Sequence, residues 1–323
     1  MRSEQSKWYR SLDAETKAAI RELHRIKPLW NLTPFVFALA WVGFGFLIMS
    51  DAHWSLRLVG YFGIGVIIHA YFSLMHEGMH GNFFRNRRWD RWYGFLVGLP
   101  TLFPVSEYAT NHLLHHKHTR TEKDPDELMY LARSKSMQSF IFYAMYFVGT
   151  YFYLLHIPYV VYTRGTNRQR IRAALERLLI FALLCGLSAA AWVFGFVDVL
   201  FHCWFLPILV TTVLASIRIG GEHQMTDADH PLRQARTVTS NVFCSFCNVH
   251  LNYHLEHHLF PRIPWYNLPK LHRVLLPEYK RHGASVYRSY LWFLWDAFRI
   301  GIHGRAPDRA SVLASARERV QEA

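Results

Sequence analysis

Apolar residues along the chain fall in long, mostly uncharged blocks separated by charged segments. The blocks 30–49 and 58–75 approach the roughly 20 residues that a helix needs to cross a hydrocarbon core of about 30 Å. Only residues 50–57 connect them, so we expect an antiparallel helical hairpin. The blocks 178–194 and 198–217 follow one another across a short glycine-containing turn and predict a second hairpin.

Two further apolar segments are not expected to cross the membrane. Residues 93–104 are too few and are interrupted by glycine and proline, which predicts a re-entrant or interfacial segment. Residues 139–162 are followed by a linker, 163–177, that carries five arginines. The positive-inside tendency places this linker on the same side as the basic segments 85–91 and 117–123. We therefore expect 139–162 to form a helix or a helix pair at the headgroup level, and a fifth span is the alternative.

The pattern predicts an all-α membrane protein with four transmembrane helices in two hairpins, a cytosolic histidine-rich helical cap and interfacial helices. Residues 1–29 are charged, lack the apolar core of a cleavable signal peptide, and predict a cytosolic amphipathic helix. We assign residues 30–290 to the membrane domain. Residues 291–323 are expected to form a loose or helical cytosolic C-terminal extension.

The composition supports the membrane assignment and excludes other classes. Hydrophobic residues make up 51% of the chain, which is high for a soluble enzyme. The formal net charge is +13, but no nucleic-acid-binding motif accompanies it, so we expect no nucleic-acid partner. The four cysteines form no disulfide framework, and we interpret the pair Cys244 and Cys247 as structural.

Histidines supply the candidate chemistry, because many of the 20 in the chain are clustered. Each cluster places imidazoles three or four positions apart, so that they share one face of a helix, and the expected topology brings the clusters to one membrane face. The clusters are His76 and His80, then His112, His115 and His116, and finally His254, His257 and His258. Eight imidazoles exceed the needs of one four- or five-coordinate ion, so we expect two metal ions, and neutral nitrogen ligands suit Fe, Zn, Cu or Ni.

The three clusters resemble the histidine boxes of the integral-membrane fatty acid desaturase and hydroxylase superfamily. The matching sequences are HEGMH at 76–80, HLLHH at 112–116 and HLEHH at 254–258. The wider segment 252–261 is similar to the third-box region of bacterial and plastid-type acyl desaturases, and RIGGEH at 218–223 is similar to a motif that ends in an additional ligand. The resemblance thus implies a di-iron centre with the metal ligands His76, His80, His112, His115, His116, His223, His254, His257 and His258.

The resemblance also implies an O2-dependent oxidoreductase that desaturates a fatty acyl chain, carried by a membrane lipid or an acyl thioester. The topology expected from the charges places the histidine boxes on the cytoplasmic side. Two Fe ions would be the cofactors of this enzyme and O2 its co-substrate. Electrons would come from an external donor such as a ferredoxin or a cytochrome b5-type carrier, because the sequence has no haem domain, iron–sulfur cysteine run or Rossmann fingerprint. Basic residues are candidates for docking an acidic carrier, or else for attracting anionic lipid: Arg85, Arg87, Arg88, Arg91, Lys270, Arg273, Lys280 and Arg281.

Other functions remain open at this point. A carotenoid ketolase or hydroxylase, or an acyl or alkane hydroxylase, would share the same superfamily and similar boxes. HEGMH also fits the H-E-x-x-H motif of zinc metalloproteases, with Glu77 as the general base, but that reading leaves the histidines of the second and third boxes without a role. A haem-binding or metal-transporting membrane protein is disfavoured because the boxes lie at or beyond the ends of the expected spans.

Several further polar residues have two interpretations. Glu77, Asp124, Asp126 and Glu256 either orient imidazole rings or are solvated loop carboxylates. We expect His69, His156 and His202 to be hydrogen-bonded interior or interfacial residues. We expect His118, His250, His272 and His282 to support the site or to lie on the surface.

Overall fold

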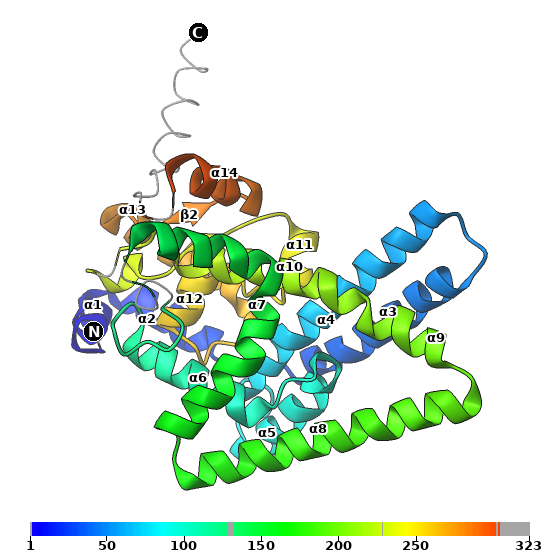
Figure 1. Ribbon diagram of the computed structural model, residues 1–323. Coiled ribbons are helices and arrows are strands. Elements are labelled where there is room, and N and C mark those ends of the chain that lie inside the picture. The colour runs from blue at the N-terminus through cyan, green and yellow to red at the C-terminus, as the bar shows by residue number, and fades with distance from the viewer. Residues whose placement is uncertain (1, 128–131, 133, 228, 302, 304–323) are drawn as a thin grey trace. The chain divides into compact units, whose positions relative to one another are not determined.

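The computed structural model describes residues 2–127, 132, 134–227, 229–301 and 303, and their regular structure is almost entirely helical (Figure 1). A short parallel pair of strands, β1 (Thr237–Val238) and β2 (Val286–Tyr287), accompanies the helices, with Thr237 opposite Val286. The chain divides into two compact units. Unit 1 comprises residues 1–25, 118–143 and 217–323, and unit 2 comprises residues 26–117 and 144–216.

The helices follow one another with short connections. Their bounds are α1 Arg2–Ser11, α2 Ala14–Leu23, α3 Thr33–Met49, α4 Trp54–His80, α5 Arg87–Gly98, α6 Val105–His118, α7 Lys135–Arg164, α8 Asn167–Phe194, α9 Val197–Leu200, α10 Pro207–His223, α11 Val242–Cys247, α12 His254–Leu259, α13 Leu268–His282 and α14 Tyr290–Ile300. Single turns of 3-10 helix lie at Pro28–Leu32, Leu99–Thr101, Pro231–Arg233 and Trp265–Asn267, and a π-helical turn lies at Phe201–Phe205.

Four helical segments of the described chain are long and apolar enough to cross a membrane: Pro28–Met49, Trp54–His80, Asn167–Phe194 and Val197–His223. They confirm the four long apolar helices expected from the sequence. The last three segments extend beyond their apolar blocks chiefly because polar residues at the block ends continue the helix, whereas the first gains only Pro28 and Leu29. The second and fourth therefore carry HEGMH and His223 on their last turns, which fixes the direction in which these imidazoles project.

Helices α3 and α4 of unit 2 pack closely through glycines. A methyl group on Gly60 would lie 2.6 Å from Cγ1 of Ile48, and one on Gly63 would lie 2.5 Å from the ring of Phe44. Both distances are shorter than carbon atoms tolerate, so the two positions require glycine for this approach. The packing supports the end of α4, where the first histidine box lies.

Helix α7 bends by 103° between its arms Lys135–Gly149 and Tyr151–Arg164 (Figure 1). Each arm would rise only about 22 Å, less than a hydrocarbon core of about 30 Å. Counting both arms as one broken span would give a fifth crossing. The expectation that residues 139–162 lie at the headgroup level remains a prediction.

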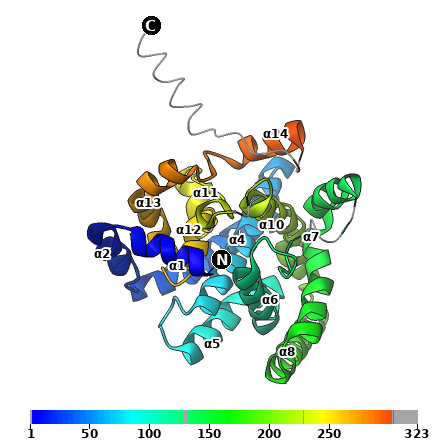
Figure 2. The same ribbon diagram turned by 90° about the vertical axis from the view of Figure 1, so that its left-hand side faces the viewer.

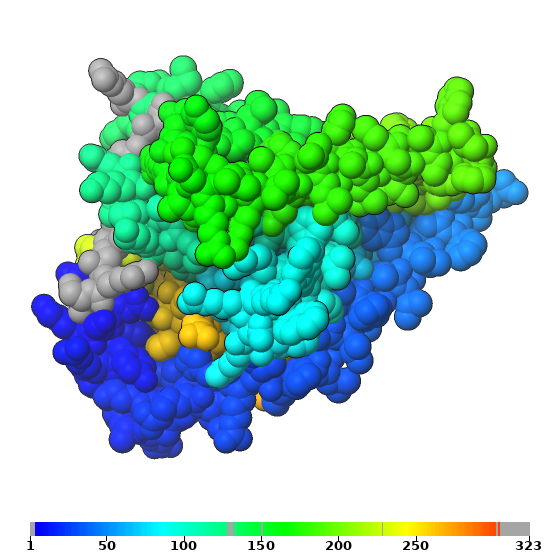
Figure 3. All heavy atoms as spheres, turned by 90° about the horizontal axis from the view of Figure 1, so that it is seen from below, coloured from blue at the N-terminus to red at the C-terminus, as the bar shows by residue number. Residues whose placement is uncertain are grey.

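Helix α8 of unit 2 is exposed along its length in Figure 3, and many of its exposed side chains are apolar. Exposed positions include Leu178, Phe181, Trp192, Val193 and Phe194, and Trp192 is 81% exposed. An apolar surface of this kind would be unfavourable in water and is suited to lipid. It supports the membrane character of the helix.

The N-terminal segment forms two helices rather than the single amphipathic helix that the sequence predicts. Asp13 starts α2 by accepting hydrogen bonds from the backbone nitrogen of Thr16 at 2.6 Å and from its hydroxyl at 2.7 Å, and this cap separates α1 from α2. Both helices belong to unit 1 with α13 (Figure 2). Trp8 Nε1 donates to Glu278 at 3.0 Å, and Gln5 donates at 2.7 Å to the carbonyl of Leu259, the last residue of α12.

Replacing Trp8 with alanine is expected to destabilise unit 1 by about 3–5 kcal/mol, since a buried indole is removed and Glu278 loses a hydrogen bond. Thermal unfolding of the purified protein in detergent measures the effect. Lys7→Ala, at the exposed neighbouring position, is the matched control and should leave the melting temperature unchanged. Equal melting temperatures for both variants would show that α1 contributes nothing to the core of unit 1.

Residues 304–323, the greater part of the expected C-terminal extension, lie outside the described residues. The first part of that extension, from 291 to 300, belongs to α14. The boundary drawn at residue 291 from the sequence therefore falls just inside this helix.

Candidate metal centre

The first histidine box lies on the last turn of α4. His76 and His80 are one turn apart on the same helix face, with ring centroids 4.8 Å apart. The helix ends at His80 and is capped by Gly81, whose φ of +76° is the left-handed conformation that terminates helices and favours glycine. Gly78, inside the box, lets α5 approach, because a methyl group there would lie 2.9 Å from the Cα of Gly94.

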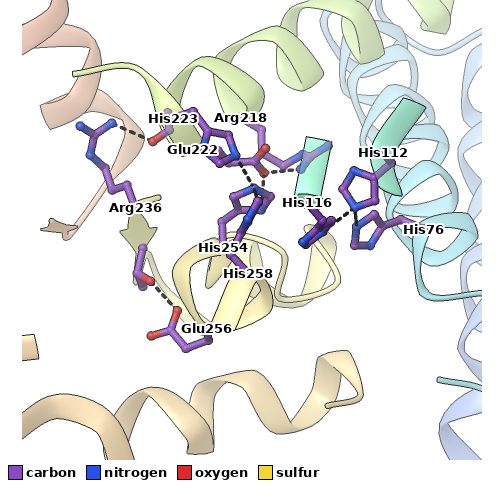
Figure 4. Close-up of polar contacts among 12 residues, drawn as sticks. His76, His112, His116, Arg218, Glu222, His223, Arg236, His254, Glu256 and His258 are labelled. Atoms are coloured by element: carbon purple, nitrogen blue, oxygen red, sulfur yellow. Dashed lines mark hydrogen bonds and ion pairs between the residues drawn. The ribbon is translucent and has the colours of Figure 1, made fainter. Parts of the chain in front are cut away.

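The second box brings two further imidazoles to the same place in unit 2. Nε2 of His112 lies 2.8 Å from Nε2 of His76 and 2.9 Å from Nε2 of His116 (Figure 4). The ring of His80 lies 5.2 Å from that of His112 and 5.0 Å from that of His116. The ligand nitrogens of these four histidines all lie within 4.8 Å of one another, and we call the group cluster A: His76, His80, His112 and His116.

Acidic and basic residues fix the start of α6, the helix that carries the second box. Glu107 is buried and accepts two hydrogen bonds from the guanidinium of Arg177, at 2.9 and 2.5 Å. Glu176 accepts from the backbone nitrogen of Ser106 at 2.7 Å and from its hydroxyl at 2.5 Å. These contacts attach the first turn of α6 to α8 and thereby hold His112 and His116 in register.

Replacing Arg177 with alanine is expected to destabilise unit 2 by about 1–3 kcal/mol, because the buried carboxylate of Glu107 loses a two-point charged partner. The effect stays at this modest size because the Arg177 side chain is 46% exposed and water reaches it. Thermal unfolding measures the change. Arg168→Ala on the same helix, at an exposed position, should leave the unfolding temperature unaltered, and an equal loss in both variants would refute the role of the Glu107 pair.

The third box and the end of α10 form a second group, in unit 1. Nε2 of His254 lies 2.9 Å from Nε2 of His223 and 3.0 Å from Nε2 of His258 (Figure 4). The ligand nitrogens of the three lie within 4.8 Å of one another, and we call the group cluster B: His223, His254 and His258. His223 directs Nδ1 to the carbonyl oxygen of Gln234 at 3.1 Å. A carbonyl only accepts, so Nδ1 carries the proton and Nε2 is left with its lone pair for a metal.

Two charged residues beside cluster B were not assigned a role from the sequence. Glu222 forms an ion pair with Arg218, one turn earlier in α10, and both side chains are buried. Oε1 of Glu222 also lies 3.3 Å from Nδ1 of His254 (Figure 4). The sequence does contain an indication of this ion pair. An arginine and a glutamate lie four positions apart near the end of an apolar helix, where unpaired charges are costly.

Arg236 is a second residue that sequence reasoning missed. Its fully buried guanidinium donates to the backbone carbonyls of Gly221 and Gln224, each at 2.8 Å, and so binds the C-terminal end of α10. It lies over the rings of Tyr287 and Phe293, at 4.9 and 5.1 Å from their centroids. A cation at a helix C-terminus is favourable, and here it holds the turn that carries His223.

The two remaining predicted ligands are buried next to the cluster on their own helix. The ring of His115 lies 5.8 Å from that of His112, and the ring of His257 lies 5.7 Å from that of His254. Seven of the nine predicted ligands therefore gather in clusters A and B. His115 and His257 stay predicted ligands.

The carboxylates that had two interpretations are bound within the protein. Glu256 is fully buried and accepts hydrogen bonds from Thr237 and, at 2.5 Å, from Nδ1 of His272. Asp124 accepts from the backbone nitrogens of Arg120 and Asp126, both at 3.0 Å.

Glu77 is also fully buried, accepts from Asn82 at 2.9 Å and lies 3.7 Å from Nδ1 of His76. A general base must reach a water molecule, so the surroundings of Glu77 disfavour the metalloprotease reading.

Three of the other histidines have contacts away from the clusters. His202 pairs with the hydroxyl of Tyr61 at 2.7 Å, His250 lies 3.3 Å from the carbonyl oxygen of Trp265, and His282 lies 3.6 Å from Glu278.

The chemistry of both clusters fits a bound metal ion. In each cluster one Nε2 atom faces two others at 2.8 to 3.0 Å, although an imidazole nitrogen makes only one good hydrogen bond in its ring plane. Burial lowers the pKa of His112 well below its usual value, and the neighbouring imidazoles lower it further. The ring is therefore neutral at physiological pH, which is the state that binds metals.

Comparisons with known proteins agree with this geometry. The family described as fatty acid desaturase matches residues 52–290. An sn-1 oleoyl-lipid 12-desaturase of Arthrospira platensis is 26% identical over 284 residues, which cover 80% of this chain and 78% of that protein. A beta-carotene ketolase of Paracoccus sp. is 27% identical, covering 68% of this chain and 81% of that protein.

A third relative is an sn-1 acyl-lipid omega-3 desaturase (ferredoxin) of Synechocystis sp., 24% identical over 281 residues, which cover 78% of this chain and 71% of that protein. The family match spans well over half of the chain and includes all three histidine boxes. The chain therefore belongs to the membrane fatty acid desaturase superfamily.

Proposed function

We propose that this protein is a di-iron oxidoreductase that uses O2 and external electrons to desaturate a fatty acyl chain. The observation that carries the proposal is the convergence of imidazole nitrogens from buried and half-buried histidines in clusters A and B, in a chain that belongs to a desaturase family. Members of the family are di-iron enzymes. Two of the three relatives described above are named as acyl-lipid desaturases, which favours an acyl chain on a membrane lipid as the substrate.

We assign one iron ion to each cluster. His115 and His257 are assigned as further ligands of these two ions, so that nine imidazoles hold two ions. When bound, two iron ions supply the capacity to activate O2 with two electrons and to attack an unactivated C–H bond. The protein's own contribution is to hold the rings. The carbonyl of Gln234 fixes the tautomer of His223, Glu222 faces Nδ1 of His254, and burial of His112 and His254 keeps water away.

The electron donor is proposed to be a separate acidic carrier. On α13 of unit 1 the basic side chains Lys270, Arg273, Lys280 and Arg281 are exposed and available for docking, as is the basic segment 85–91 in unit 2. Charge complementarity raises the rate of association and is screened by salt. Electron transfer is therefore expected to slow as salt is raised while membrane attachment persists, and a rate that is insensitive to salt would remove this docking mode.

We also propose that the four spans form two hairpins with the histidine boxes on the cytoplasmic side. Residues 30–290 would form the membrane domain and residues 1–29 would be cytosolic. A reporter that is active only in the cytosol, fused after residue 323, is expected to be active. Activity of a reporter that works only outside the cytosol would contradict this orientation.

Metal and product analysis of the expressed protein tests the main proposal. We expect two iron ions per chain and a new double bond in the membrane fatty acids of a suitable host. One zinc ion per chain would instead support the metalloprotease. Because one relative is named as a beta-carotene ketolase, oxidation of a carotenoid is the second candidate reaction. Unchanged acyl chains together with an oxidised carotenoid would replace the first proposal with the second.

A further inference from the structure

Unit 1 exposes large apolar side chains on a restricted set of elements. Among the described residues of unit 1, these side chains lie on the start of α7, on α11 and on α14. Leu276 on α13 is the one exception. They include Phe140 at 68%, Val242 at 86%, Phe243 at 76%, Leu291 at 77% and Phe298 at 65% exposure. We call this set the apolar face of unit 1. Monomeric soluble proteins rarely leave such a contiguous apolar surface uncovered.

Backbone and ring contacts hold the three elements together. After the paired strands β1 and β2, the backbone nitrogen of Ser240 donates to the carbonyl of Arg288 at 3.0 Å. The chain therefore enters α11 and α14 side by side, since each helix starts two residues later. Helix α7 joins them through Tyr143, whose hydroxyl donates to the carbonyl of Ala297 at 2.8 Å and whose ring stacks on Phe298 at 5.1 Å.

The exposed charges of α14 and of the segment just before it are basic, which suits contact with a lipid surface. Its one acidic residue, Asp296, is buried and accepts a hydrogen bond from the hydroxyl of Tyr287 at 2.8 Å. Arg288, just before the helix, and Arg299, near its end, are both exposed. The outer side thus combines apolar and aromatic side chains with positive charge and no carboxylate, which suits anionic headgroups.

We propose that α14, with α11 and the start of α7, is a membrane-surface anchor that embeds the apolar face of unit 1 in the boundary between headgroups and acyl chains. Trp292 and Trp295 are both exposed on α14, and tryptophan favours this depth of a bilayer. Exposed tryptophans together with basic charges, as found in the described residues 288–300, suit a lipid interface, and an acidic protein partner is the alternative that crosslinking would detect. The anchor assigns residues 291–300 to the lipid interface instead of the loose or helical cytosolic extension expected from the sequence, and it does not depend on the metal chemistry.

Spin labelling of the full chain in nanodiscs of phosphatidylcholine and phosphatidylglycerol tests the anchor. A nitroxide is attached in turn to Leu291→Cys and Phe298→Cys, with Cys185, Cys244 and Cys247 replaced by serine and the buried Cys203 retained. Both labels should be more accessible to O2 than to a water-soluble nickel chelate. Leu276→Cys is the matched control, an exposed leucine of unit 1 outside the apolar face, and its label should favour the nickel chelate. If the labels at both 291 and 298 were more accessible to the nickel chelate than to O2, the proposal would be overturned.

A photo-crosslinking amino acid at position 295, in the chain with all of its cysteines, provides a second measurement that does not rely on the altered background. Adducts with phospholipid, found by mass spectrometry, support the anchor. Adducts with a second copy of this chain or with another protein would overturn it. Fewer lipid adducts in discs of phosphatidylcholine alone would support the part played by Arg288 and Arg299, and an equal yield would remove that part.

Discussion

Replacing His112 with alanine is expected to remove one of two bound iron ions and to lower turnover by at least about 100-fold. Its Nε2 atom is the one that faces both His76 and His116 in cluster A, so its loss removes the centre of the group. Changes in residues that merely orient a ligand typically cost 10- to 100-fold, and the loss of a ligand should exceed this. Iron per chain, measured beside the rate of product formation, gives the result.

The control for this variant must separate metal loss from misfolding. His202→Ala is suitable, because His202 also belongs to unit 2 but pairs with Tyr61 outside cluster A. It should retain both iron ions. The His112→Ala protein should still insert in membranes and elute as the wild type does. Two retained iron ions in a folded His112→Ala protein would exclude His112 as a ligand and with it the present composition of cluster A.

The helices and the histidine pairs could be predicted because both depend on local periodicity. No proline interrupts the chain between residue 58 and Gly81, and the glycines in between do not end the helix, so the second apolar block and HEGMH form one continuous helix. A spacing of four residues then brings His76 beside His80 whatever the surroundings. The same holds for His112 with His116 and for His254 with His258.

The supporting contacts could not be predicted, because they join segments that are distant in the sequence. Arg236 lies outside any long periodic segment, and its partners Tyr287 and Phe293 come about 50 residues later. A helix pair over residues 139–162 was one of the two expectations, but the position of the bend in α7 could not be predicted, because its proline, Pro158, is not at the bend. The division between α1 and α2 depends on Asp13, a cap whose sequence context is weak, so periodicity alone predicted one helix.

Replacing Glu222 with alanine is expected to weaken iron binding at one of the two sites by about 10- to 100-fold. In the native protein its carboxylate lies 3.3 Å from Nδ1 of His254, where it favours the tautomer that leaves Nε2 for the metal. The substitution removes this acceptor. It also leaves the buried guanidinium of Arg218 without its ion-pair partner. Titration of the iron-free protein with ferrous iron should show one unchanged and one weakened site.

Two further variants distinguish positioning from a general loss of stability. Glu222→Gln keeps an oxygen that can accept from His254 while removing the charge, so it should recover most of the lost affinity if orientation is the main effect. The double variant Arg218→Met with Glu222→Leu removes both buried charges and should therefore unfold near the wild-type temperature. If this stable double variant still binds iron weakly at one site, Glu222 is a positioning residue for His254. If it binds both ions as tightly as the wild type, the pair serves only to neutralise its own charges within α10.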